Sequence, residues 1–190
     1  MVRNVRAIVT ITVVFLILQI AVILALAYQG RPDYMRSVAG TTVFMVVYTF
    51  LEARYGLIMN NYVRVLVMLA ILIDGLFGYC FNLYTTSAVF DKVLHIFGTY
   101  AFALFFYVLV VQMIANPVVK PVKFILAACL GLSIGASYEI LEFFTDSLSH
   151  PSPPSQPSLW DTNTDLISDA VGALLAAVHV VFRTFINRDF

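Results

Sequence analysis

Hydrophobic positions along the chain fall into six long stretches that are separated by shorter polar segments. A helix needs about 20 mainly apolar residues to cross the hydrocarbon of a bilayer. The stretches therefore predict an all-α protein, a polytopic membrane bundle of about six transmembrane helices. Their expected ranges are residues 7–27, 37–51, 62–84, 91–114, 122–144 and 164–185. The second stretch is short because the charged residues Glu52 and Arg54 follow it.

The connections are short except for the segment between the fifth and sixth stretches. Residues 147–160 contain four of the seven prolines, and serine fills most of the positions between them. Proline removes a backbone donor and breaks a helix, so this segment is expected to be an outer loop. It is interpreted as a spacer, with a lid as the alternative. Residues 1–190 are taken as a single transmembrane domain.

Composition supports a bilayer as the surrounding solvent. Hydrophobic residues make up 61% of the chain and charged residues 12%, and the mean hydropathy is +0.92. Soluble domains have about 45–50% apolar and about 25% charged residues. The formal net charge is zero, which argues against nucleic acid as a partner. The expected partners are the lipid bilayer and an amphiphilic or lipid-linked substrate, and the oligomeric state is left open.

The distribution of Lys and Arg predicts the orientation of the helices. Loops on the cytoplasmic side of membrane proteins carry an excess of these residues. With the N-terminus inside, eight of them fall on inner segments and three on outer ones. The inner residues are Arg3, Arg6, Arg54, Arg64, Lys120, Lys123, Arg183 and Arg188, and the outer ones are Arg31, Arg36 and Lys92. Both termini are therefore predicted to be cytoplasmic, which agrees with an even number of spans.

Acidic residues gather where three of the predicted helices reach one membrane face. They lie at the start of the fourth helix, the end of the fifth and the start of the sixth, all on the outer side. The set consists of Asp91, Glu139, Glu142, Asp146, Asp161, Asp165 and Asp169. His95 lies one turn after Asp91. Residues three or four positions apart are neighbours on a helix surface, so each helix presents one acidic face.

Structural explanations exist for some members of this set. Asp91 and Asp161 are placed where helix N-caps occur. Asp169 lies too deep in its helix for capping. Glu139 and Glu142 are near the C-terminal end of a helix, where the helix dipole disfavours negative charge. These three residues are therefore harder to explain as structural.

The acidic set as a whole predicts a cation site. Ionised side chains inside a membrane are costly and usually mark function, and clustered carboxylates need protons or a cation to balance them. Lys92 is the only basic residue nearby in the sequence, so a divalent metal ion is expected. Carboxylates with one imidazole suit Mg²⁺, Mn²⁺, Fe²⁺ or Zn²⁺. The expected ligands are Asp91, His95, Glu139, Glu142, Asp161, Asp165 and Asp169. Asp74, within the third helix, has no partner that the sequence identifies.

Three segments carry a resemblance to a known family. They are DKVLH at 91–95, YEILEF at 138–143 and DTNTDLISDAVGA at 161–173. In this order and spacing they resemble the YjdF-like inner-membrane proteins and, more distantly, the VanZ-like membrane proteins. The likeness covers roughly residues 80–180.

The resemblance implies a prokaryotic plasma-membrane protein but supplies no reaction. It implies a shared site built from Asp91, His95, Glu139, Glu142, Asp161 and Asp165. The chain departs from the VanZ-like pattern at Glu142 and in its Pro/Ser-rich loop, where a basic residue often occurs in that family. These departures weaken any transfer of an antibiotic-resistance role.

Three hypotheses follow. The leading one is a metal-dependent enzyme that acts at the outer face on a lipid or a lipid-linked cell-envelope substrate. Glu139 or Glu142 would then act as general base, and His95 as ligand or acid. The first alternative is a proton- or cation-coupled transporter, because carboxylates and histidine within membranes form proton relays. The second alternative is a non-catalytic bundle with a structural cation.

Overall fold

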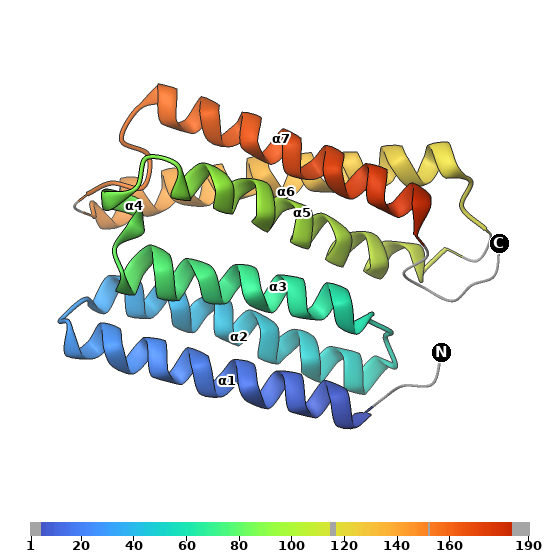
Figure 1. Ribbon diagram of the computed structural model, residues 1–190, viewed down its shortest axis with the longest axis horizontal. Helices are drawn as coiled ribbons and strands as arrows, with labels where there is room; N and C mark the ends of the chain where they lie inside the picture. Colours follow the sequence, from blue (N-terminus) through green and yellow to red (C-terminus); the bar gives the residue numbers. More distant parts are fainter. Residues whose placement is uncertain (1–4, 115–116, 152, 184–190) are drawn as a thin grey trace.

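The computed structural model describes residues 5–114, 117–151 and 153–183, and its regular structure over these ranges is entirely helical. Six long helices run up and down alongside one another (Figure 1). They are α1 (Val5–Tyr28), α2 (Pro32–Tyr55), α3 (Asn61–Ile73), α5 (Phe90–Val111), α6 (Lys120–Ser149) and α7 (Leu159–Phe182). A π-helical segment η1 (Asp74–Cys80) continues α3, and the short α4 (Leu83–Thr86) precedes α5. The predicted all-helical membrane bundle is confirmed.

Five segments within the described ranges are long and apolar enough to cross a membrane. They are Val5–Tyr28, Asn61–Cys80, Phe90–Val111, Lys120–Leu148 and Leu159–Phe182. The sixth long helix, α2, has 24 residues, which correspond to about 36 Å of helical rise. Its length suffices for a crossing, but Asp33, Arg36, Glu52 and Arg54 make its composition more polar than that of the others.

Several predicted boundaries differ. The second span was predicted at 37–51, whereas α2 runs from Pro32 to Tyr55, because the polar residues at its two ends continue the helix. Two other boundaries depend on local backbone features that the hydropathy pattern does not reveal. The sixth predicted span begins at Leu159 rather than 164, because the Ser158 hydroxyl accepts a hydrogen bond from the Asp161 backbone N–H at 3.1 Å. The third ends at Cys80 rather than 84, where Asn82 adopts a left-handed conformation with φ of 60°. Because α6 extends to residue 149, the outer loop is shorter than predicted. Arg3, Asn116 and Arg188 lie outside the described residues.

The helices form two groups of three, α1–α3 and α5–α7 (Figure 1). The start of α5, the end of α6 and the start of α7 lie at one end of the molecule, beside α4 and the α1–α2 turn. The start of α1 and the end of α7 lie at the opposite end. The three acidic helix ends are therefore gathered at a single end of the bundle. The side of the membrane that this end faces remains a prediction from the charge distribution.

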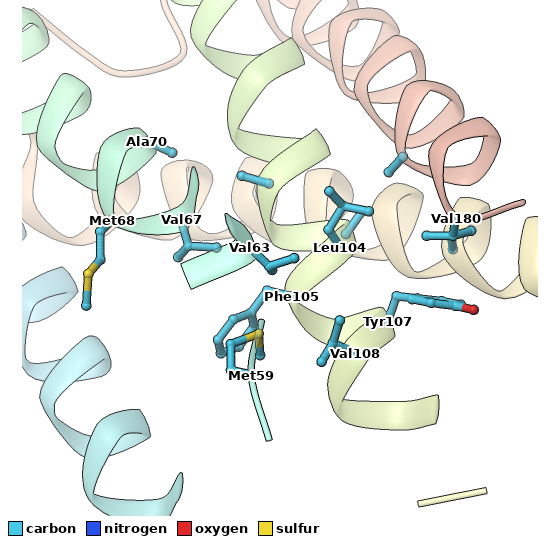
Figure 2. Packing of buried hydrophobic residues seen from close by; sticks show 14 of the residues in the cluster. Met59, Val63, Val67, Met68, Ala70, Leu104, Phe105, Tyr107, Val108 and Val180 are labelled. Atoms are coloured by element: carbon cyan, nitrogen blue, oxygen red, sulfur yellow. The ribbon is translucent and has the colours of Figure 1, made fainter. Parts of the chain in front are cut away.

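Apolar packing between α3 and α5 joins the two groups (Figure 2). Val63 and Val67 of α3 and Leu104 and Val108 of α5 are fully buried in this core. Within the second group, α6 and α7 approach closely at glycines. A Cβ atom at Gly131 would lie 2.8 Å from the Cα atom of Ala173. Small residues allow membrane helices to pack closely, and this packing sets the positions of the acidic side chains.

Candidate functional site

The buried imidazole of His95 lies at the centre of the acidic set. Its Nδ1 atom is 3.1 Å from Asp169 Oδ1 and 3.8 Å from Glu139 Oε1. Its Nε2 atom is 3.6 Å from Asp91 Oδ1 and 3.8 Å from Asp165 Oδ1. One imidazole from α5 thus faces four carboxylates from three helices, and it can neutralise one negative charge at most.

Lys92 divides this set into two parts. Its ammonium group lies 2.9 Å from Asp91 Oδ2, 2.6 Å from Asp161 Oδ1 and 2.7 Å from Asp165 Oδ1. The sequence shows Lys92 as a lone cation, whereas the fold places it between α5 and α7 in contact with three aspartates. These carboxylates already share a positive charge, so they need a metal ion less than the rest of the set does.

The second part consists of His95, Glu139 and Asp169, all three of them buried. One potential ligand atom from each lies within 4.8 Å of the other two. Glu139 Oε1 and Asp169 Oδ2 are buried and receive no hydrogen bond from any residue that the structure describes. A buried acceptor without a partner is costly. These two oxygens therefore mark a place where a positively charged ligand would be stabilising.

Geometry fits a metal ion at this triad. An ion with ligands at about 2.1 Å holds neighbouring ligand atoms roughly 3.0–3.4 Å apart. The distances from His95 Nδ1 are 3.1 Å to Asp169 Oδ1 and 3.8 Å to Glu139 Oε1, close to this range. Asp169 Oδ1 already accepts from Thr99, so Asp169 would bind an ion through Oδ2, the oxygen of the same carboxylate that has no donor. A second combination, Asp91, His95 and Asp165, has similar spacing, but Lys92 already contacts both of its aspartates.

Neighbouring groups fix the orientation of Asp169. The Thr99 hydroxyl donates to Asp169 Oδ1 at 2.5 Å. A Cβ atom at Gly135 would lie 2.5 Å from the Asp169 carboxyl carbon, so only glycine leaves room for the carboxylate there. Thr99 follows His95 by four residues on α5, a spacing that could have identified it in the sequence.

A loop residue fixes the orientation of Glu139. The Gln156 side-chain amide donates to Glu139 Oε2 at 2.8 Å and to the Glu139 backbone carbonyl at 2.9 Å. Asp146 in turn accepts hydrogen bonds from the backbone N–H groups of Ser155 and Gln156, both at 2.8 Å. The Pro/Ser-rich loop is therefore more than a spacer, because it folds back onto the site. No periodic pattern in the sequence pointed to Gln156.

Glu142, expected as a metal ligand, belongs to neither part. It is half-buried, and no described side chain hydrogen-bonds to its carboxylate. It lies three residues after Glu139 on α6, so its position is near the triad rather than within it. The seven expected ligands thus separate into three that contact Lys92, three centred on His95 and one beside them.

Asp74, for which the sequence identified no partner, has one in the structure. The Tyr84 hydroxyl donates to Asp74 Oδ1 at 2.6 Å. Asp74 also lines a cavity of about 440 Å³ together with His95, Thr99 and Asp169. Tyr84 was predicted to be the last residue of the third span, where a continuous helix would place it about 15 Å along the axis from Asp74. The structure instead ends that span at Cys80 and places Tyr84 in α4, where it can turn back toward Asp74. The cavity connects this aspartate with the buried triad.

Comparisons with known proteins give a family without an activity. A family model described as "Predicted membrane protein (DUF2238)" matches residues 10–184. An uncharacterized protein of Thermotoga maritima is 31% identical over 121 residues, which cover 64% of this chain and 62% of the relative. No solved structure gives a significant match. The match agrees with the YjdF-like resemblance without naming that group, and it does not show a relationship to VanZ-like proteins.

Proposed function

Since the chain belongs to the DUF2238 family of predicted membrane proteins, we propose that it is a membrane enzyme whose divalent cation is held by His95, Glu139 and Asp169. The observation that carries this proposal is the pair of buried carboxylate oxygens, Glu139 Oε1 and Asp169 Oδ2, that lack hydrogen-bond donors. Both belong to side chains that contact or approach the same imidazole nitrogen. A cation there would give both oxygens a partner.

The donor set narrows the choice of ion. One imidazole nitrogen with two carboxylates suits Mn²⁺, Fe²⁺ or Zn²⁺. Such an ion polarises a carbonyl or phosphoryl oxygen or activates a water molecule. Thr99 donates a hydrogen bond to the Asp169 carboxylate, and Gln156 donates one to the Glu139 carboxylate. Hydrogen bonds of this kind hold metal ligands in the orientation that binding requires.

Two further roles follow from position. Glu142 is the carboxylate best placed as general base, because it lies near Glu139 and Lys92 makes no ion pair with it. Lys92 clamps the start of α5 to the start of α7 through Asp161 and Asp165. This clamp keeps His95 and Asp169 in register across the two helices.

The location of the site indicates the class of substrate. The triad lies in the half of the bundle where α5 and α7 begin, and His95 and Asp169 border a cavity with mostly apolar walls. This position suits an amphiphile, such as a lipid or a lipid-linked precursor of the cell envelope. We place the protein in a prokaryotic plasma membrane, with the site at the outer face, because its relative is bacterial and Lys and Arg favour the opposite end.

The transporter alternative is less well supported. A proton or cation path would need titratable groups from Asp74 toward the other end of the bundle. Away from the polar end, the described walls of the cavity are formed by residues such as Phe44, Phe102 and Phe106. A hydrophobic wall suits a hydrocarbon chain better than an ion.

Metal content is the first measurement. Protein purified without chelator after Mn²⁺, Fe²⁺ or Zn²⁺ supplementation is analysed by elemental mass spectrometry. We expect one ion per chain in the wild type, its loss in His95→Ala and Asp169→Asn, and its retention in Asp91→Asn and Glu142→Gln. Absence of an ion in the wild type, or its retention in His95→Ala and Asp169→Asn, would overturn the proposal.

Turnover separates an enzyme from a bundle with a structural cation. The wild type is screened against radiolabelled membrane lipids in proteoliposomes. An enzyme predicts turnover that is lost in Glu142→Gln although the ion is retained. A bound ion without any turnover would favour a structural cation, and turnover that persists in metal-free His95→Ala would reject the role of the metal.

A further inference from the structure

The cavity beside the triad is a groove between α2 and α6, with α3 and α5 behind it. Three helices contribute lining residues at one-turn intervals, as expected for helix faces that converge. These residues are Ser37, Thr41 and Phe44 of α2; His95, Thr99, Phe102 and Phe106 of α5; and Ile134, Tyr138 and Leu141 of α6. Over the described residues, no Cα atom of α2 lies within 8 Å of one in α6. The groove therefore separates these two helices.

The groove opens sideways, toward lipid. The lining residues that are exposed all belong to the two flanking helices, and those of α5 are buried or only partly exposed. Phe44 of α2 is 38% exposed, and Tyr138 and Leu141 of α6 are 41% and 62% exposed. At the back of the groove, Ala70 and Ile71 of α3 are buried. In a bilayer, the surface between α2 and α6 borders hydrocarbon, so a ligand can enter from the membrane without passing through water.

The dimensions of the groove match one leaflet of a membrane. His95 and Phe106 line its two ends along α5, and eleven residues of helix rise about 16 Å. Half of the hydrocarbon thickness of a bilayer is about 15 Å. Polar groups gather at the His95 end, where Asp74, Tyr84 and Asp169 also line the wall. The groove is therefore polar at one end and apolar along a length similar to that of a lipid tail.

The volume of the cavity fits a small apolar ligand. It is about 440 Å³, within the range of about 300–1,000 Å³ that is typical of small-molecule sites. A hydrocarbon chain is much thinner than a helix, which is about 10–12 Å across with its side chains. A single chain can therefore lie along the groove with its polar head at the His95 end.

We propose that this groove binds one hydrocarbon chain of a bilayer lipid, which enters between α2 and α6 and brings its polar head to His95 and Asp169. The inference rests on the proposed function only for the fate of the head group. Binding of the chain itself depends on the apolar walls and not on a metal ion.

Gly98 offers a way to fill the groove without disturbing the triad. It lines the cavity, and a Cβ atom placed there would meet nothing within 4 Å. A larger side chain therefore projects into open space, and replacing an internal helix glycine also improves helix propensity. Gly40 of α2 is a matched control, because it too has nothing within 4 Å but does not line the cavity.

Photolabelling tests the proposal. The full chain is reconstituted in phosphatidylglycerol vesicles that contain phosphatidylglycerol with a mid-chain diazirine, irradiated, and mapped by peptide mass spectrometry. We expect label on the segment from Phe102 to Phe106. Gly98→Leu should reduce this label roughly tenfold, because the leucine overlaps the bound chain, whereas Gly40→Leu should leave it unchanged.

A second pair of variants tests the groove from the α6 wall, opposite α2. Ser137 lines the groove, and its hydroxyl donates to the Ser133 carbonyl one turn earlier in α6. Ser137→Phe should also reduce labelling of residues 102–106, and Ser133→Phe, one turn away and outside the lining, should not. Equal labelling in the plugging variants and their controls, or label confined to the outer surfaces of α2 and α6, would overturn the proposal.

Metal analysis of the same samples separates the two proposals. Gly98→Leu should keep the ion and lose the label, and His95→Ala should lose the ion and keep the label. If the wild type contains no metal but is labelled, and Gly98→Leu reduces that label, the result would support the groove and reject the metal centre. Bound metal with a label that Gly98→Leu does not change would reject the groove alone.

Discussion

The two halves of the bundle bury charged groups in opposite ways. Between α2 and α3, the Arg64 Nη2 atom lies 2.7 Å from both carboxylate oxygens of Glu52, and both side chains are buried. The Tyr48 ring lies 5.9 Å from the guanidinium carbon, which adds a weak cation–π attraction. One cation here meets one anion. In the other half, carboxylates outnumber the cations that face them.

This difference separates a structural pair from a site that needs a ligand. Glu52 and Arg64 neutralise each other's charge, and neither lines the cavity. Arg64 Nε and Nη1 are buried without a hydrogen-bond partner among the described residues, but no net charge is left over. Around His95, three buried carboxylate oxygens have no hydrogen-bond donor among the described residues: Glu139 Oε1, Asp165 Oδ1 and Asp169 Oδ2. Asp165 Oδ1 is ion-paired with Lys92 at 2.7 Å, so the oxygens of Glu139 and Asp169 remain without a cation, and Asp169 borders the cavity. Buried charge alone therefore does not identify function in this protein. An imbalance of charge next to an accessible space is the more informative feature.

The largest predicted effect concerns the balanced pair. Arg64→Ala leaves the Glu52 carboxylate buried without a partner, and breaking such a pair costs about 3–5 kcal/mol. We expect the free energy of unfolding in detergent to fall by this amount. The double variant Glu52→Leu with Arg64→Met should remain close to the wild type, since apolar replacement of both partners is often neutral. If Arg64→Ala were as stable as the double variant, the Glu52 carboxylate would not depend on Arg64 as its partner, and the interpretation as a balanced pair would be wrong.

The site around His95, Glu139 and Asp169, where carboxylates outnumber cations, should instead be stabilised by added metal. At a metal concentration about a hundredfold above Kd, binding stabilises the folded state by about 2.7 kcal/mol. Titration of the wild type with Mn²⁺ or Zn²⁺ should therefore raise Tm, and Asp169→Asn should abolish this rise. The Glu52→Leu, Arg64→Met double variant should keep it. An equal rise in Asp169→Asn would place the stabilising ion elsewhere.

Hydropathy and charge spacing were enough to predict the bundle and the convergence of its acidic helix ends. This follows because six crossings bring the start of one helix next to the end of another. The sequence could not show how Lys92 is shared, since its contacts with Asp161 and Asp165 depend on how α7 packs against α5. In the sequence, Arg64 was counted only as an inner-side charge for orientation, and nothing there predicted that the fold buries it against Glu52.

The contact of the loop residue Gln156 with Glu139 could not be predicted from the sequence for a different reason. Helical periodicity places residues on faces, but it says nothing about the path of a proline-rich loop. The path of this loop depends on the hydrogen bonds from Ser155 and Gln156 to Asp146, at the end of α6. Gln156 reaches Glu139 only as a consequence.

The contact between Gln156 and Glu139 leads to a prediction of smaller effect for the proposed metal site. Gln156→Ala removes the donor that orients Glu139, and losing an outer-shell partner typically lowers metal affinity about 10–100-fold. The expected change is in Kd, measured by competition with a chelating dye, with one ion per chain still bound at saturation. Ser155→Ala is the matched control, because only its backbone contacts Asp146. Identical affinities in the two variants would assign the loop a purely structural role.

The smallest predicted effect compares one helix cap from each half. Asn60 caps α3, accepting from the Tyr62 N–H at 2.8 Å, and Ser158 caps α7 through the Asp161 N–H. Substitution of either residue by alanine should cost about 1 kcal/mol. Only Ser158→Ala should also weaken metal binding. Its helix, α7, carries the proposed ligand Asp169 and the two aspartates, Asp161 and Asp165, that pair with Lys92. If both variants lower metal affinity equally, the two halves are coupled as one unit and the distinction between them fails.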